Sequence, residues 1–302
     1  MHNFRDNDTL SASAAGTFRL GDRPVHRLGF GAMRLTGTGG MGRGEPRSPE
    51  QSRAVLRRAV ELGVNHIDTA GFYFSETAVA NQIIRDALAP YPDDLVIVTK
   101  VGPTRDRATG AAGEWARPDQ LRALVEQDLI ELGLDRLAVV NYRSSGRDDV
   151  SAAVEALAQL RDEGLLRHVG LSNVNAEALE AARSVTDVVC VQNRHAPGYE
   201  QPDAHEVLEI CRKDDIAFVP FFTIAGQSRE NPAQEQYDAI HAIADAHGVT
   251  AAQVRIAWNL ALGPHVLAIP GTGDPQHLEQ NVAAAALRLT DDELARLADL
   301  AG

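Results

Sequence analysis

Residues 63–76 read Gly-Val-Asn-His-Ile-Asp-Thr-Ala-Gly-Phe-Tyr-Phe-Ser-Glu and join a helix stop to a short apolar strand and a polar loop. We expect the strand at 64–67, and Asp68 and Tyr73 follow it. An aspartate at a strand end often only forms a turn or caps a helix, and a loop tyrosine often only packs at a rim. Taken alone, the stretch leaves both structural roles open.

The next expected strand, Leu-Val-Ile-Val-Thr-Lys at 95–100, gives the pair a chemical meaning. It is apolar and β-branched, as in strands buried on both faces, yet it ends in Lys100. A buried ammonium is costly unless a carboxylate meets it, and Asp68 is the candidate. Lys100 should also lower the pKa of Tyr73 from its ordinary value near 10. Tyr73 could then protonate a carbonyl oxygen as hydride arrives, or remove that proton in reverse.

Strands and helices alternate along the rest of the chain. The expected strands are 28–31, 64–67, 95–100, 137–141, 167–171, 188–192, 216–220 and 266–269. The expected helices are 49–62, 77–88, 118–132, 150–163, 176–183, 204–213, 234–247, 251–262, 275–286 and 291–300. Eight β/α units predict an α/β fold, a parallel (β/α)8 TIM barrel. Residues 17–20 and 24–27 flank a Gly-Asp turn and predict an N-terminal β-hairpin that caps the barrel.

Composition narrows the class of protein. The chain has 302 residues and is 44% hydrophobic, which suffices for one large core. We expect a flexible tail at 1–15 and a single barrel domain at 16–302. A net charge of −13 argues against nucleic acid or anionic membranes as partners. Without a signal peptide or membrane-spanning run, the chain is expected to be cytoplasmic. Cys190 and Cys211 lack metal-ligand spacing and are expected to be reduced packing residues.

Function in such barrels lies on the loops after the strands. Polar, aromatic and glycine residues gather at these positions in the sequence: Asp68, Lys100, Asn141, Ser172, Gln192, Phe221 and Gly271. Their shared position favours a site over separate structural roles.

The motif Asp-Thr-Ala-x-x-Tyr-x-x-Glu at 68–76, followed by a strand ending Thr-Lys, resembles the aldo-keto reductase family over about 17–286. The resemblance implies reduction of a small-molecule aldehyde or ketone by NADPH, with Asp68, Tyr73 and Lys100 as catalytic residues. The family usually has histidine at position 141. Asn141 can donate a hydrogen bond but cannot titrate. With Val-Val-Asn at 139–141, the chain resembles a branch of the family similar to pyridoxal reductases.

The asparagine leaves two functions open. Either Tyr73 alone handles the proton while Asn141 positions the carbonyl, or the protein is a cofactor-binding sensor or regulatory protein with little turnover. A barrel hydrolase or lyase would need a nucleophile or metal set, and the sequence offers neither.

The resemblance also implies a cofactor site. Ser172, Asn173 and Gln192 match residues that bind the nicotinamide carboxamide, although Ser172 or Asn173 could instead cap the next helix. Phe221 stands where a stacking tyrosine is usual, and a phenyl ring stacks equally well. The other implied contacts are Gly31, Met33, Phe222, Thr223, Ile224, Gly226, Ile269, Gly271, Thr272, His277, Gln280 and Asn281. Phe222 and Asn281 could equally be packing residues.

The choice between NADPH and NADH stays open in the sequence. In the family, a lysine after Pro270 and an arginine in the next helix often grip the 2′-phosphate. Gly271 and His277 replace them here. Thr272, the helix N-terminus and Arg229 could still serve. We expect NADPH and do not exclude NADH.

Substrate specificity is expected in the loops 36–44, 101–116, 142–149 and 194–201. The first is glycine-rich and could be a flexible loop or a lid near the cofactor. His195 could face the substrate or lie on the surface. Arginines in these loops indicate an anionic or polar substrate, or are surface residues: Arg105, Arg107, Arg143, Arg147 and Arg194. The family default is a monomer.

Overall fold

The strands form a closed parallel barrel, as predicted. The computed structural model describes residues 10–37, 45–106, 111–146, 149–197, 199–200, 204–222 and 234–301. Seven parallel strands are hydrogen-bonded in the order β13-β10-β9-β8-β5-β4-β3. Their bounds are β3 (Phe30–Gly31), β4 (His66–Asp68), β5 (Val96–Val101), β8 (Leu137–Arg143), β9 (Leu166–Ser172), β10 (Val188–Gln192) and β13 (Ala217–Phe218).

The eighth strand, expected at 266–269, is reduced to two isolated parallel bridges. Val266 pairs with Phe218 on one edge strand, and Ala268 pairs with Leu28 just before the other edge strand, β3. These bridges connect the two ends of the sheet, and the barrel therefore closes.

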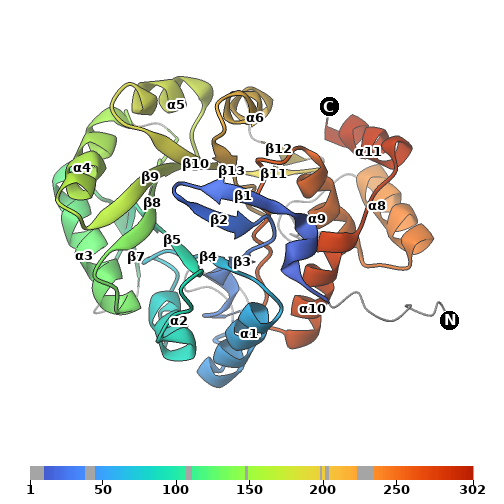
Figure 1. The fold of residues 1–302 in the computed structure, drawn as a ribbon, viewed down its shortest axis with the longest axis horizontal. Helices are drawn as coiled ribbons and strands as arrows, with labels where there is room; N and C mark the ends of the chain where they lie inside the picture. Colours follow the sequence, from blue (N-terminus) through green and yellow to red (C-terminus); the bar gives the residue numbers. More distant parts are fainter. Residues whose placement is uncertain are drawn as a thin grey trace.

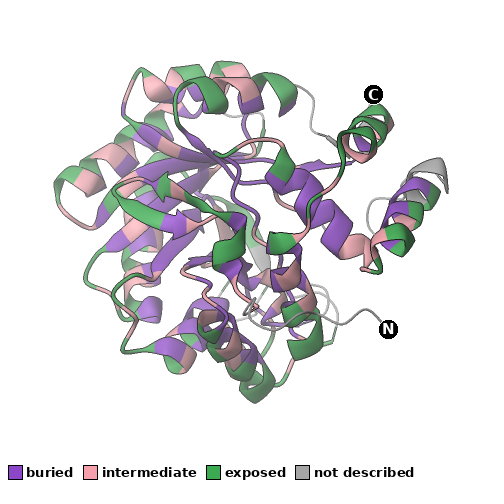
Figure 2. Ribbon diagram, turned by 45° about the vertical axis from the view of Figure 1, so that its right-hand side comes forward, coloured by how far each residue is buried: buried purple, intermediate pink, exposed green. Residues whose placement is uncertain are grey.

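Helices surround this barrel (Figure 1). They are α1 (Pro49–Glu61), α2 (Ala80–Leu88), α3 (Leu121–Leu132), α4 (Ser151–Asp162), α5 (Ala176–Arg183), α6 (Ala204–Lys213), α8 (Gln234–His247), α9 (Ala251–Ala261), α10 (Pro275–Ala283) and α11 (Asp291–Ala298). Their inner faces are buried and their outer faces exposed (Figure 2). Helix α2 begins three residues later than the sequence predicts, because Phe74 pairs with Val79 and the amide of Ala80 donates to Tyr73 O. Among the described residues, no helix is long and apolar enough to cross a membrane.

Period-two alternation fills the barrel interior. Val96 and Val98 on β5, Val139 on β8 and Cys190 on β10 belong to one buried cluster. Leu20 and Val25 join the same cluster from the hairpin β1 (Thr17–Leu20) and β2 (Arg23–His26). The hairpin lies across the middle of the strand ring in Figure 1. The predicted cap is therefore confirmed, and it closes the end of the barrel opposite the polar residues.

The expected flexible tail at 1–15 is wrong for its last residues. Ser11 caps a short 3-10 helix, η1 (Ala12–Ala15), in which Ala12 and Ala15 are buried. The amide of Ala12 donates to Leu62 O, which ties the segment to the end of α1. Residues 1–9 lie outside the described part.

Two loop expectations are also corrected. Residues 101–116 contain a hairpin, β6 (Pro103–Arg105) and β7 (Ala112–Trp115). His195 is not on the surface, because its ring stacks on Trp258 of α9 with centroids 5.3 Å apart and meets the edge of Phe218. It lies in the short hairpin β11 (His195–Ala196) and β12 (Tyr199–Glu200). Of the loop at 36–44, only Thr36 and Gly37 are described.

Candidate active site

Asp68, Tyr73 and Lys100 meet in the barrel interior. Lys100 continues the inward-facing series of Val96 and Val98, and only 2% of its surface is exposed. Its Nζ lies 2.6 Å from Asp68 Oδ2, and it also donates to Thr69 O at 2.9 Å and to Tyr73 Oη at 3.2 Å. The buried ammonium therefore meets the carboxylate of Asp68, the partner that the sequence predicts, and the phenol of Tyr73 as well.

The electrostatics differ from expectation at Tyr73. Burial is the largest single effect and would lower the pKa of Lys100, but Asp68 and Tyr73, through their charges and hydrogen bonds, together outweigh it and the pKa is raised. For Tyr73, burial raises the pKa and the opposing effect of Lys100 is smaller, so the net shift is upward. The predicted lowering is wrong because desolvation of the phenolate dominates. The phenol of Tyr73 is thus neutral and keeps its proton at physiological pH.

Asn141 lies beside this group, paired in register with Lys100 across β5 and β8. Its Oδ1 accepts a hydrogen bond from the thiol of Cys190 at 3.0 Å. A thiol has one proton to donate, so the amide oxygen faces Cys190 and the Nδ2 group points elsewhere. Nδ2 is buried and has no hydrogen-bond partner among the described residues. Asn141 therefore presents an unused donor.

Gly170 on the intervening strand β9 makes the Cys190–Asn141 contact possible. A Cβ at this position would lie 2.0 Å from Asn141 Oδ1 and 2.6 Å from the Cys190 sulfur. Both cysteines are free and buried as expected, but Cys190 has a polar contact that the sequence did not indicate.

Four expected cofactor residues end or follow strands at the same end of the barrel, its mouth. Gln192 Nε2 donates to the second carboxylate oxygen of Asp68 at 2.7 Å. Ser172 Oγ accepts from Arg143 Nη1 at 3.0 Å, and the Arg143 guanidinium lies 4.9 Å from the centroid of the Phe221 ring. Phe222 has a positive φ of 63° and packs edge-on against Phe221. Thr223, Ile224, Gly226 and Arg229 lie outside the described residues.

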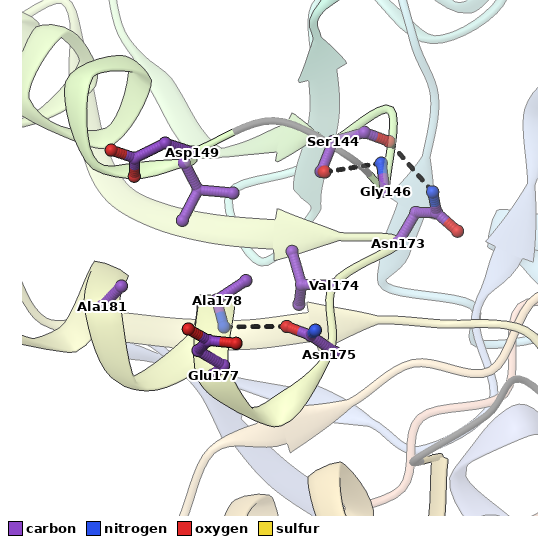
Figure 3. Close-up of a pocket in the computed structure, with 10 residues that line it drawn as sticks. Ser144, Gly146, Asp149, Asn173, Val174, Asn175, Glu177, Ala178 and Ala181 are labelled. Carbon is purple, nitrogen blue, oxygen red and sulfur yellow. Dashed lines mark hydrogen bonds between the residues drawn. The ribbon is translucent and has the colours of Figure 1, made fainter.

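Asn173 takes a different place from Ser172. Its side chain donates to Ser144 O at 3.0 Å and lines a neighbouring cavity of about 370 Å³ (Figure 3). Asn175 caps α5 by accepting from the amide of Ala178. The expectation that Ser172 or Asn173 caps this helix is therefore wrong.

The second glycine-rich segment forms a tight turn before α10. A Cβ at Gly271 would lie 2.4 Å from Gly31 O, so the two backbones pass too closely for any other residue. Asp274 caps the helix through the amides of Gln276 and His277, and its own amide donates to Thr272 Oγ1. Met33, Ile269 and Gln280 are partly buried. Asn281 is buried, and its Nδ2 has no partner among the described residues.

Arg47 was missed by sequence analysis. Its Nη1 donates to Gly273 O at 3.1 Å and its Nε donates to Arg34 O at 3.2 Å. Arg47 therefore places a cation at this turn, where Gly271 and His277 stand in place of the lysine and arginine that often grip the 2′-phosphate. No local signal could have found it, since 226 residues separate Arg47 from Gly273.

The comparisons with known proteins agree with this architecture. The model of the Aldo/keto reductase family matches residues 27–301. Pyridoxine 4-dehydrogenase of Escherichia coli is 41% identical over 294 residues, which cover 94% of this chain and 98% of that protein. An uncharacterized oxidoreductase of Schizosaccharomyces pombe is 35% identical, with 96% of this chain and 92% of that protein covered.

Solved structures give the same family. A thermostable aldo-keto reductase in complex with the inhibitor epalrestat superposes with a TM-score of 0.78 at 27% identity, over 94% of this chain and 99% of that one. An aldo-keto reductase from Klebsiella pneumoniae in complex with NADPH gives 0.76 at 26% identity, over 94% of each chain. The expected family and barrel fold are confirmed: the chain belongs to the aldo/keto reductase family.

Proposed function

We propose that this protein reduces an aldehyde or ketone to an alcohol with NADPH, and that Tyr73 supplies the proton. The carrying observation is the buried chain of contacts from Asp68 through Lys100 to Tyr73 Oη. The bound cofactor would supply the hydride. As the carbonyl oxygen gains negative charge, Tyr73 passes its proton to it and Lys100 stabilises the phenolate that remains.

Asn141 would hold the carbonyl oxygen through Nδ2. This donor is buried, unpartnered among the described residues and next in register to Lys100. A carbonyl oxygen there would receive one hydrogen bond from Nδ2 and one from the Tyr73 hydroxyl. An asparagine can therefore replace the orienting role of a histidine, while proton transfer is left to Tyr73.

The cofactor fits the residues at two places. Ser172, Gln192 and Phe221 form a polar and aromatic edge beside Lys100, suited to the nicotinamide ring and its amide. The turn before α10, with Gly31, Gly271 and Arg47, brings backbone and a cation together as a phosphate requires. NADPH in a related structure from Klebsiella pneumoniae supports the same cofactor here. NADH remains the alternative to test.

We propose pyridoxal as a substrate, since the Escherichia coli relative at 41% identity is a pyridoxine 4-dehydrogenase. We also propose that the protein is cytoplasmic and monomeric. Size-exclusion chromatography with light scattering would check the oligomeric state.

The test is oxidation of NADPH and NADH with pyridoxal and simple aromatic aldehydes, followed by absorbance. Tyr73→Phe should lower kcat about 10²–10⁴-fold without changing the Kd for NADPH. Tyr91→Phe is the matched control, because its hydroxyl donates to Leu132 O outside the site. Equal activity of Tyr73→Phe and wild type would reject the proton role. Cofactor binding without turnover of any carbonyl would favour the sensor function instead.

A further inference from the structure

Arg143 is the outermost inward-facing residue of β8. Val139 lies in the barrel core and Asn141 beside Lys100, and Arg143 follows two residues later on the same face of the strand. Two residues of strand rise about 7 Å, so Arg143 lies one layer above the proposed carbonyl donor, at the mouth. It is paired in register with Ser172 on β9.

The guanidinium of Arg143 has donors to spare. It carries five N–H groups. Among the described residues it makes one hydrogen bond, to Ser172 Oγ, and stacks on Phe221. No carboxylate of the described chain forms an ion pair with it. A partly buried arginine in this position is a ready anion-binding group.

A second cation increases the positive charge at the mouth. The Arg194 guanidinium lies 6.0 Å from the centroid of the same Phe221 ring and 5.4 Å from that of Phe222. Burial and then the repulsion of Arg194 act to lower the pKa of Arg143, whereas Tyr73 and Asp68 raise it, and the net shift is downward. Asp68 is already engaged by Lys100 and Gln192. An anion beside Arg143 would therefore offset the cost of burying its charge and, to a lesser degree, the repulsion from Arg194.

We propose that Arg143 binds an anionic oxygen of the substrate that lies close to its carbonyl group, such as a phenolate or carboxylate ortho to an aldehyde. The inference rests on the proposed reductase function and specifies its substrate class. When the carbonyl oxygen of the substrate lies on Asn141, a second substrate oxygen a few atoms away lies toward the next layer of β8, where Arg143 can bind it. Pyridoxal has such an oxygen next to its aldehyde.

The probes are 2-hydroxybenzaldehyde and 2-methoxybenzaldehyde, which have similar shapes but differ in whether the ortho oxygen can ionise. Their kcat/KM values are compared between pH 6 and 9 for wild type, Arg143→Gln, Arg143→Lys and Arg136→Gln. Arg136 precedes the same strand at the opposite end of the barrel, where it donates to Leu166 O. The Kd for NADPH is measured separately by fluorescence.

In wild type, the preference for the hydroxy compound should rise with pH as its phenol ionises. Arg143→Gln should reduce kcat/KM for the ionised aldehyde about 10–100-fold and leave the methoxy compound within about 3-fold. Arg143→Lys should restore part of the preference, and Arg136→Gln should behave as wild type.

Three results would overturn the inference. An equal loss for both aldehydes would make Arg143 a structural residue. A higher Kd for NADPH in Arg143→Gln, without a change in aldehyde preference, would show that Arg143 binds the cofactor instead. If the preference of wild type for the hydroxy compound did not change with pH, the enzyme would not be recognising the ionised oxygen. In each case, turnover of the methoxy compound by wild type would show that the reductase function itself stands. If wild type turned over no aldehyde at all, both the reductase function and the role of Arg143 would be rejected.

Discussion

The thiol of Cys190 on β10 donates a hydrogen bond to Asn141 Oδ1 on β8, across the bare backbone of Gly170 on β9. Three strands thus cooperate to orient one amide. The burial of Cys190 raises the pKa of its thiol, so the sulfur keeps the proton that it donates.

Removal of this donor should impair catalysis. Cys190→Ala should lower kcat about 5-fold, because a net hydrogen bond is worth about 1 kcal/mol and Asn141 would lose its fixed orientation. Cys190→Ser keeps a donor and should restore most of the rate. Steady-state kinetics with Cys211→Ala as the control, a buried thiol on α6, would check this. If Cys190→Ala slows the Asn141→Ala variant as much as it slows wild type, the two residues act independently.

Asp68→Asn should damage both catalysis and stability. It leaves the Lys100 charge buried without its carboxylate, and breaking such a pair costs about 3–5 kcal/mol. We expect that loss in urea unfolding, together with a fall in kcat. Glu279→Gln removes the half-exposed ion pair with Arg58, which water screens, and should cost far less than the loss of Asp68. Similar losses for the two variants would contradict the burial argument.

Arg47 should set the preference for NADPH over NADH. Arg47→Gln is expected to raise the Kd for NADPH about 10-fold, the effect of one charge-assisted hydrogen bond to a phosphate, and to leave NADH nearly unchanged. Fluorescence titration of the two cofactors measures this directly. Arg57→Gln on α1, whose guanidinium donates to Ala87 O, is the control. A parallel change for both cofactors would show that Arg47 only shapes the turn.

Acid should destabilise the fold through two buried histidines. Burial lowers the pKa of His66 from 6.5 to about 4, and that of His195 likewise to about 4. The unfolded chain therefore takes up protons first, and the stability present above pH 6.5 is lost as the pH falls toward 4. Each histidine contributes about 3 kcal/mol to this loss.

His66→Leu tests the effect. The drop in unfolding free energy between pH 7.5 and pH 4 should shrink by that amount, whatever the absolute stability of the variant. His205→Gln, an exposed histidine on α6, should leave the drop unchanged. An unaltered pH dependence in His66→Leu would mean that its ring is protonated in the folded state.

Most of the architecture was predictable because its signals are local. Strand Val188–Gln192 and helix Gln234–His247 have the bounds that were expected from apolar runs and helical periodicity. The hairpin in 101–116 was missed, since Gly and Arg residues carry no strand pattern. The burial of His195 could not be predicted, because the residue that covers it, Trp258, comes from a distant helix.

The sequence by itself determined the order of the β/α units, and thereby which residues stand at the ends of strands. Asp68, Tyr73, Lys100 and Asn141 could be named as a group because alternation and turn residues act over a few positions. Only the tertiary structure decided that Gln192 holds Asp68, that Cys190 orients Asn141, that Arg47 reaches Gly273 and that the pKa of Tyr73 rises. These depend on strand register, barrel closure and burial, which arise from the packing of the whole chain rather than from any one segment of it.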